Sequence, residues 1–386
     1  MNNGQIDHPR HSRQRHLMID ALNLARGGGV VVMWRLAFAF ASKGYRVTVL
    51  TARDLPGANS AGSGVEIIVQ PSARGGLRAM LYRLFRLTAR AKYIGADAVL
   101  GFNYHAKVTL PQVTYHINII PFLEFDARRK AVGYLRAITQ RLAARSALRR
   151  STANIFESDY VRTLAARSGI TIRNPTVAYI GAEEQDHLSV CTNYRLSGPF
   201  VTVTSGAPHK RNDLTLTFFR RILAKEPNAK LVIVGDVGAI RAGLSAEDRK
   251  FIDASDQVSF KGYLARDQLY ELLAQARALI VFSELESFFM VAIEAMSVGC
   301  PVIAADGTSI RESVGSAALV VPAGDVDAAV SAAGLLTTPE VFARQEAVGR
   351  KWASTFEADK CANSFVAAFE NAIWPTSETV EGKRRP

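Results

Sequence analysis

The chain has 386 residues, of which 48% are hydrophobic and 21% are charged. This length exceeds what one ordinary core accommodates and predicts two domains of roughly 190 residues each. The hydrophobic content excludes a disordered chain. Because no apolar run reaches about 18 uninterrupted residues, no segment is expected to span a membrane.

The polar start of the chain lacks the apolar stretch of a signal peptide. Its three cysteines, Cys191, Cys300 and Cys361, lie far apart and in no metal-binding spacing. This usage predicts a reducing compartment and no zinc site. We therefore expect a cytoplasmic protein.

The formal net charge of +12 is concentrated in the first half of the chain. Residues 1–190 carry 26 Lys and Arg against 12 Asp and Glu, whereas residues 191–386 carry 21 against 23. An anionic partner is therefore expected on the first half.

The first half alternates strand-like and helix-like segments. A buried strand is predicted over residues 17–24, followed by the triple glycine 27–29, an apolar helix over 30–42 and a strand over 46–51. A strand, a glycine turn, a helix and a second strand form a βαβ unit, which requires a parallel sheet. Further strands are predicted over 65–69 and 98–101.

A plausible linker over residues 186–200 separates this half from a second alternation. Strands are predicted over 200–204, 230–236, 258–261, 278–283 and 302–305, and helices over 212–225, 265–276 and 290–298. The pattern predicts an α/β protein with two doubly wound Rossmann-like domains facing a central cleft. The predicted domains are 1–190 and 191–358, and residues 359–386 form a helix that returns toward the first domain, followed by a polar tail.

Two glutamates near the C-terminal third, Glu286 and Glu294, stand eight positions apart. Eight helical residues rise about 12 Å, which exceeds the roughly 5–9.5 Å between the two carboxylates of a glycoside hydrolase. We expect Glu286 in a loop, where it faces a sugar ring, and Glu294 one turn inside a helix, where it accepts hydrogen bonds from a ribose. Solvated helix charges are the alternative for both.

The residues between these glutamates are predicted to hold an anion through their backbone amides at a helix start. They are Ser287, Phe288, Phe289 and Met290.

Lys210 and Arg211 follow the first strand of the second domain, where a cation can neutralise a diphosphate leaving group. Gly27 and Gly28 permit close backbone approach to a ligand, although a bare tight turn has the same signature. Tyr263 follows another predicted strand and could stack on a nucleobase or pack elsewhere.

His116 follows an apparent strand of the first domain and could contact the transferred sugar. A hydrogen-bonded core histidine is the alternative, and the sequence leaves the two open.

These residues together resemble the retaining GT-B glycosyltransferases of family four. Their motif is close to Glu-Gly-Phe-Gly-Leu-Pro-x-x-Glu-Ala-Met-Ala-x-Gly-x-Pro-Val, and residues 286–302 reproduce both glutamates, the phenylalanine, Glu-Ala-Met, the glycine and Pro-Val. Ser287 and Phe289 stand where the motif has glycines. The likeness extends across the second domain and, more weakly, into the first.

The resemblance implies a GT-B hexosyltransferase (EC 2.4) in cell-surface polysaccharide or lipopolysaccharide biosynthesis. It would transfer a sugar from a nucleotide-diphosphate donor to a glycan or lipid-linked acceptor, without a metal or cofactor and with retained anomeric configuration. By resemblance, Glu286 lies near the sugar, Glu294 holds the ribose, Lys210 binds the diphosphate and His116 is on the sugar side.

Two basic stretches of the first half, 75–92 and 127–150, combine cations with aliphatic side chains. Such helices can lie on an anionic membrane, which would make the protein peripheral at the inner face of the cell membrane. Packed helices with a solvated basic face explain the same pattern.

Three alternatives to a glycosyltransferase stay open. The substituted glycine at Phe289 fits a catalytically impaired sugar-nucleotide-binding protein. An epimerase or phosphorylase could share the fold, although no cofactor-lysine signature of a phosphorylase is evident. A basic nucleic-acid-binding protein would interleave aromatics with its cations on a sheet face, whereas the basic stretches here are aliphatic.

Overall fold

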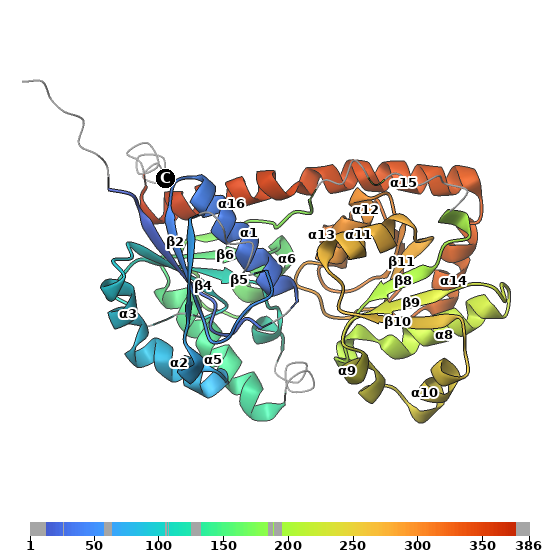
Figure 1. Cartoon of the computed structure of the whole chain (residues 1–386), viewed down its shortest axis with the longest axis horizontal. Helices are drawn as coiled ribbons and strands as arrows, with labels where there is room; N and C mark the ends of the chain where they lie inside the picture. The colour runs from blue at the N-terminus through green and yellow to red at the C-terminus, as the bar shows by residue number, and fades with distance from the viewer. Residues whose placement is uncertain are drawn as a thin grey trace, which may run out of the picture.

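A computed structural model describes residues 13–25, 27–57, 64–104, 106, 108–124, 133–183, 188 and 195–375 (Figure 1). The predicted domain boundary at residues 190 and 191, Cys191, and the polar tail after residue 375 lie outside the described residues. In the described part of the chain, no helix combines the length and the apolar character needed to cross a membrane.

The first lobe contains a seven-stranded parallel sheet in the order β3-β2-β1-β4-β5-β6-β7. Its strands are β1 (His16–Asp20), β2 (Arg46–Thr51), β3 (Val65–Val69), β4 (Ala98–Phe102), β5 (Gln112–His116), β6 (Ala153–Phe156) and β7 (Pro175–Val177). Its helices are α1 (Gly28–Ser42), α2 (Gly76–Phe85), α3 (Leu87–Tyr93), α5 (Tyr134–Arg150) and α6 (Asp159–Ala166).

The second lobe contains a six-stranded parallel sheet in the order β10-β9-β8-β11-β12-β13. Its strands are β8 (Phe200–Val203), β9 (Leu231–Val234), β10 (Val258–Gly262), β11 (Ala278–Val281), β12 (Val302–Ala305) and β13 (Leu319–Val321). Its helices are α8 (Asn212–Leu223), α9 (Val237–Ala242), α10 (Ala246–Asp253), α11 (Arg266–Ala274), α12 (Met290–Ser297), α13 (Ile310–Val314), α14 (Val326–Leu335) and α15 (Pro339–Ala353).

The inner strands of both sheets are buried along almost their whole length. All five residues of β1 and all four of β9, β11 and β12 are buried, as expected where helices cover both faces of a parallel sheet. The two predicted Rossmann-like domains of an α/β protein are therefore confirmed. Strand β1 is shorter than the strand predicted over 17–24. It ends at Asp20, whose side chain pairs with Arg83 of α2.

The last helix, α16 (Ala358–Ile373), packs on the first lobe. Phe365 and Phe369 are fully buried in the core of that lobe, and both rings meet Phe40 of α1 edge-on. In Figure 1, α15 and α16 run along one side of the molecule, from the second lobe back to the first.

The chain passes between the lobes twice, and the two crossing segments lie side by side. The Ala182 amide donates to the carbonyl of Phe356 at 2.8 Å, and the Ala358 amide donates to the carbonyl of Ala182 at 2.9 Å. Gly181 is needed here, because a Cβ atom at this position would lie 2.0 Å from the Phe356 carbonyl oxygen. A side chain would force the two crossings apart.

Candidate active site at the interdomain cleft

The loops that follow β8 and β11 meet at the topological switch point of the second sheet. These neighbouring strands are where the strand order reverses direction, and open α/β sheets bind ligands in the crevice at that point. The Glu284 amide donates to the carbonyl of His209 at 2.8 Å and ties the two loops together. Both the predicted diphosphate cation and the first motif glutamate lie in these loops.

Lys210 and Glu286 form an ion pair at this edge. The Lys210 Nζ lies 2.6 Å from Glu286 Oε1, and both side chains are largely but not fully buried. Lys210 ends the 3₁₀ turn η4 (Pro208–Lys210), so the turn aims the side chain across to the β11 loop. A partly desolvated cation of this kind interacts strongly with an anionic ligand.

The backbone of Glu286 is fixed from both sides by hydroxyl groups. Its amide donates to Thr308 Oγ1 at 2.8 Å, and its carbonyl accepts from Thr308 Oγ1 at 2.8 Å and Ser309 Oγ at 2.9 Å. These bonds hold the backbone of Glu286 in one orientation.

The predicted anion cradle of amides over residues 287–290 is wrong in two of its members. The Phe289 amide donates to Ser313 Oγ at 2.8 Å, and the Met290 amide donates to the carbonyl of Phe288 at 3.1 Å. Both amides are thus engaged within the second lobe. The Phe288 and Phe289 side chains are buried in its core, so the large residue at 289 packs inward, with its ring centroid 5.7 Å from Lys210 Nζ.

Glu294 lies one turn inside α12, as predicted, because the helix begins at Met290. Its carboxylate is buried and lies 2.8 Å from Arg266 Nη2, an ion pair that the sequence did not indicate. Arg266 begins α11, three residues after Tyr263, whose side chain is exposed. The ribose contact of Glu294 and the base contact of Tyr263 stay predictions.

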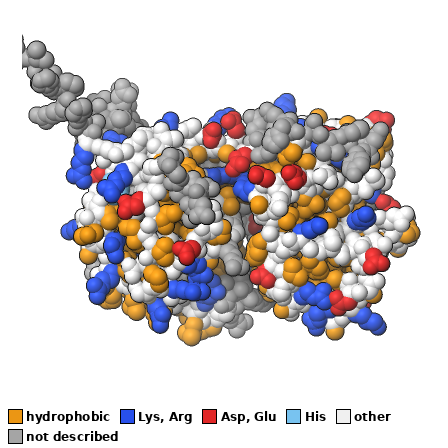
Figure 2. All heavy atoms as spheres, in the orientation of Figure 1, with side chains coloured by type: hydrophobic (Ala, Val, Ile, Leu, Met, Phe, Trp, Pro, Cys, Tyr) orange, Lys and Arg blue, Asp and Glu red, His pale blue; other side chains and the backbone are white. Residues whose placement is uncertain are grey.

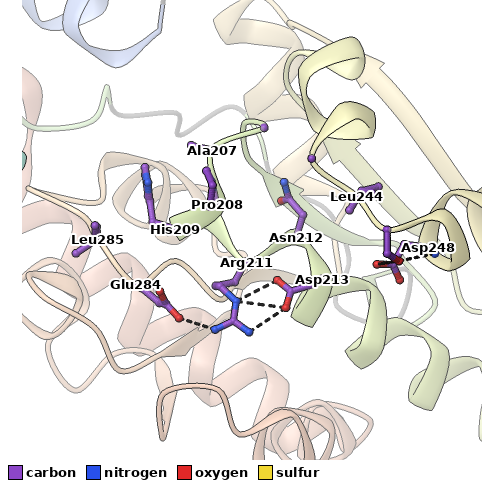
Figure 3. A pocket seen from close by; sticks show the side chains of 13 residues that line it. Ala207, Pro208, His209, Arg211, Asn212, Asp213, Leu244, Asp248, Glu284 and Leu285 are labelled. Carbon is purple, nitrogen blue, oxygen red and sulfur yellow. Dashed lines mark hydrogen bonds and ion pairs between the residues drawn. The ribbon is translucent and has the colours of Figure 1, made fainter. Parts of the chain in front are cut away.

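An open pocket of about 670 Å³ adjoins these loops (Figure 3). Arg211 crosses it between two carboxylates, at 2.5 Å from Glu284 and 2.9 Å from Asp213, and these bonds raise the pKa of its guanidinium. Burial and the charge of Lys210 lower the pKa of His209, which also lines the pocket, so its ring is neutral at pH 7. Arg211 is thus held by acidic neighbours.

The glycine turn of the first lobe reaches this site through Ile117. A Cβ atom at Gly29 would lie 3.2 Å from Ile117 Cδ1, whereas Gly27 and Gly28 face open space. The φ of Gly27 is +79°, a backbone conformation that favours glycine. The Ile117 carbonyl accepts from Ser287 Oγ at 3.1 Å, so the glycine turn and the motif loop face one cleft.

His116 takes the role of a core histidine and does not line the cleft. The side chain is 1% exposed, stacks on Phe156 with a centroid distance of 4.8 Å, and bonds Asn154 through Nε2 at 2.9 Å. Burial lowers the pKa of its imidazole to about 4, against the opposing effect of the Asn154 bond. The sugar contact implied by resemblance is not made by the side chain in this conformation.

Nothing in the sequence pattern singles out the residues that join the lobes around the motif loop. Ser158 Oγ donates to the Ser287 carbonyl at 2.5 Å, and Ser287 Oγ lies 2.8 Å from the Glu157 carboxyl. Glu312 of α13 accepts from the amides of Asp159 and Tyr160 at the start of α6. A carboxylate of one lobe thus caps a helix of the other. These contacts join residues far apart in the sequence, so no local sequence pattern indicates them.

Metal ligands do not gather at this site. Over the described ranges of the chain, no three His, Cys, Asp or Glu side chains come together as a metal-binding group.

Comparison with known proteins identifies a family that the second lobe resembles. Residues 199–347 match the family model of the glycosyl transferases group 1. The lipopolysaccharide 1,2-N-acetylglucosaminetransferase of Salmonella typhimurium is 36% identical over 114 residues, and the O-antigen chain mannosyltransferase B of Escherichia coli is 34% identical over 115 residues. These matches cover 28% and 29% of this chain, and the chain spans only 30% of the length of each relative.

Solved structures match the whole fold. Sucrose-phosphate synthase from Thermosynechococcus elongatus superposes with a TM-score of 0.76 at 16% identity, over 94% of this chain and 100% of the other. HepE of Anabaena in complex with UDP-glucose superposes with a TM-score of 0.71 at 17% identity, over 92% and 99%. The chain therefore has the GT-B fold, and its residues 199–347 match the group 1 glycosyl transferases.

Proposed function

We propose that the protein is a retaining glycosyltransferase that moves a sugar from a nucleotide-diphosphate sugar to a glycan or lipid-linked acceptor in cell-surface polysaccharide biosynthesis. The Lys210–Glu286 ion pair at the switch point carries this proposal. It lies within the residues that match the group 1 family. Relatives that act on lipopolysaccharide and O-antigen support the glycan class.

The ion pair suits a donor-triggered exchange of partners. A diphosphate carries more negative charge than one carboxylate, so a bound donor takes Lys210 from Glu286. Glu286 is then free to accept hydrogen bonds from the sugar hydroxyls. The exchange couples donor binding to placement of the carboxylate beside the sugar.

The chemical step needs no metal in this proposal. The bond between the anomeric carbon and the diphosphate oxygen breaks while the acceptor oxygen bonds to the same face of that carbon. The acceptor hydroxyl gives its proton to an oxygen of the leaving phosphate, and Lys210 neutralises the charge that develops there. Glu294 and Tyr263 would hold the ribose and the base, and the open Gly27–Gly28 turn would admit the sugar end of the donor.

Exchange of Lys210 for methionine tests the proposal. With a nucleotide-sugar pool and a membrane-lipid extract as acceptor, Lys210→Met should lower kcat about 10²–10³-fold, as loss of a charge-stabilising group does. Lys225→Met is the matched control, because Lys225 is exposed just beyond the opposite end of α8. Proton NMR of the product should show the anomeric configuration of the donor.

Two results would contradict this account. Equal turnover by the Lys210 and Lys225 variants would remove the diphosphate contact, and an inverted product would remove the retaining mechanism. Donor binding without transfer to any acceptor would favour the catalytically impaired alternative.

We also propose an anionic membrane surface as the place where the acceptor is met. Helix α2 exposes an apolar row that the core does not use, formed by Leu77, Met80, Leu81, Leu84 and Phe85. Exposed patches of this kind mark interaction surfaces. The exposed cations Arg78 and Arg86 lie beside the row, and Figure 2 shows Lys and Arg side chains next to hydrophobic ones on this lobe.

The orientation of α2 is set by a buried ion pair. Arg83, the inward-facing cation of the helix, lies 2.5 Å from Asp20 at the end of β1 and is buried with it. Removing either partner would leave an unpaired buried charge. The pair therefore fixes Arg83 on the inward side of α2 and leaves the apolar row outward.

A further inference from the structure

Glu157 is a buried carboxyl group at the centre of the contact between the lobes. It follows β6 at the carboxyl edge of the first sheet and is 5% exposed. Its amide donates to the carbonyl of His116 at 3.1 Å, which fixes the backbone. Its Oε2 lies 2.8 Å from the Oγ of Ser287, the residue directly after Glu286.

The single proton of the Ser287 hydroxyl limits the direction of this hydrogen bond. Its Oγ also lies 3.1 Å from the Ile117 carbonyl oxygen, which can only accept. A hydroxyl has one proton to donate. If that proton satisfies Ile117, the bond to Glu157 requires the carboxyl to be the donor. Both contacts are full two-centre hydrogen bonds only when Glu157 is protonated, because an ionised Glu157 has to share the single Ser287 proton with Ile117.

The surroundings of Glu157 favour the protonated form. Burial raises the pKa of its carboxyl to about 8, the negative charge of Glu286 adds to this effect, and the bond with Ser287 opposes it to the extent that the hydroxyl donates. Among the residues that the structure describes, the titratable groups that face it are Glu286 from the motif loop and Tyr115 from β5, both acids. Lys210, the nearest cation to Glu286, is engaged by that carboxylate.

We propose that Glu157 is a positioning residue, which donates its carboxyl proton to Ser287 across the cleft and thereby holds the loop that carries Glu286 against the first lobe. Ser158, whose Oγ donates to the Ser287 carbonyl, makes a second contact with the same residue. We call these two contacts of Ser287, with Glu157 and with Ser158, the clasp. The functional consequence rests on the proposed role of Glu286 at the sugar. The clasp itself does not depend on that role.

Deprotonation would reverse the clasp. A Glu157 carboxylate can only accept, so the Ser287 hydroxyl donates its hydrogen bond to Glu157, and the Ile117 carbonyl loses its donor. It also places a second negative charge near Glu286. The loop should therefore loosen from the first lobe as the pH rises through about 8.

Unfolding at different pH values tests the clasp without any donor. Glu157→Gln keeps an N–H donor for Ser287 but cannot ionise, and Glu157→Ala removes the donor. Between the ordinary carboxyl pKa of 4.5 and about 8, the folded chain holds the proton and the unfolded chain has lost it. Relative to Glu157→Gln, the unfolding constant of the wild type should therefore rise about tenfold per pH unit in this window and level off above it.

Two further readouts separate positioning from general stability. The infrared band of a protonated carboxyl should be present in the wild type at pH 7, absent at pH 9.5 and absent in Glu157→Gln. Hydrogen exchange of residues 284–289 at pH 9 should be faster in the wild type than in Glu157→Gln. In Glu157→Ala, exchange of the same residues should be fast at both pH 7 and pH 9.

Parallel unfolding curves for wild type and Glu157→Gln, or the absence of a protonated-carboxyl difference band, would overturn the proposal. If either variant proves too unstable to purify, the infrared difference between pH 7 and pH 9.5 in the wild type decides alone. None of these measurements uses a sugar donor, so they fail or succeed independently of the proposed transferase activity.

Discussion

At the scale of single residues, the carboxylate of the second motif glutamate is already paired with an arginine. Glu294 is buried and lies 2.8 Å from Arg266 Nη2, and Arg266 also donates to the Tyr270 hydroxyl at 2.9 Å. The guanidinium fixes the carboxylate while leaving it a second oxygen for a ligand. A ribose diol would complete the hydrogen bonds of a group that the protein has already oriented.

Glu294→Gln should weaken donor binding about 10–100-fold, because a hydrogen bond to a charged group contributes about 1.5–3 kcal/mol. Calorimetric titration with a nucleotide-diphosphate sugar measures the effect. Glu271→Gln on the exposed side of α11 is the control and should bind like the wild type. If both variants bind alike, the ribose contact of Glu294 is wrong.

At the scale of elements, α2 exposes its apolar row and buries one of its cations. Leu77 is 67% and Phe85 75% exposed, whereas Arg83 is buried against Asp20. The sequence pattern could not distinguish this arrangement from a helix packed on its apolar face, because both orientations have the same periodicity. The partner of Arg83 lies at the end of β1, 63 positions earlier.

Vesicle co-sedimentation tests the membrane role of α2. The double variant Leu77→Ser/Phe85→Ser should reduce binding to phosphatidylglycerol-containing vesicles at least about tenfold, since each buried large apolar side chain contributes about 1.5–3 kcal/mol. Leu335→Ser is the control, because Leu335 is 53% exposed on the other lobe. Equal losses in both variants, or equal binding to neutral phosphatidylcholine vesicles, would refute an anionic membrane surface.

At the scale of the whole molecule, the strand–helix alternation predicted two parallel sheets and most of their strands, but not β6, β7 and β13. Parallel strands buried on both faces give apolar runs that are local in sequence, and turn glycines such as Gly27 mark where they end. The site was predicted in part for the same reason. Lys210 and Glu286 lie in segments that directly follow strands, and Glu294 lies in the helix after Glu286, so the topology alone brings these segments to one edge.

The contacts between the lobes escaped prediction because they join distant segments. Glu312 meets the start of α6 across 153 positions, and Ser287 meets Glu157 across 130. His116 shows the converse problem. Its position at the end of β5 fits a cleft residue, but the ring turns inward to Asn154, and no local pattern records that turn.

Binding of a nucleotide-diphosphate sugar to the unmodified protein tests the central claim most directly. A panel of such donors should contain at least one that stabilises the fold by about 2.7 kcal/mol at about 100 times its Kd. The stabilisation should persist in the presence of a metal chelator and be lost in Lys210→Met. If no member of the panel changes the melting temperature, or if Lys210→Met responds like the wild type, the assignment of this cleft as a donor site is contradicted.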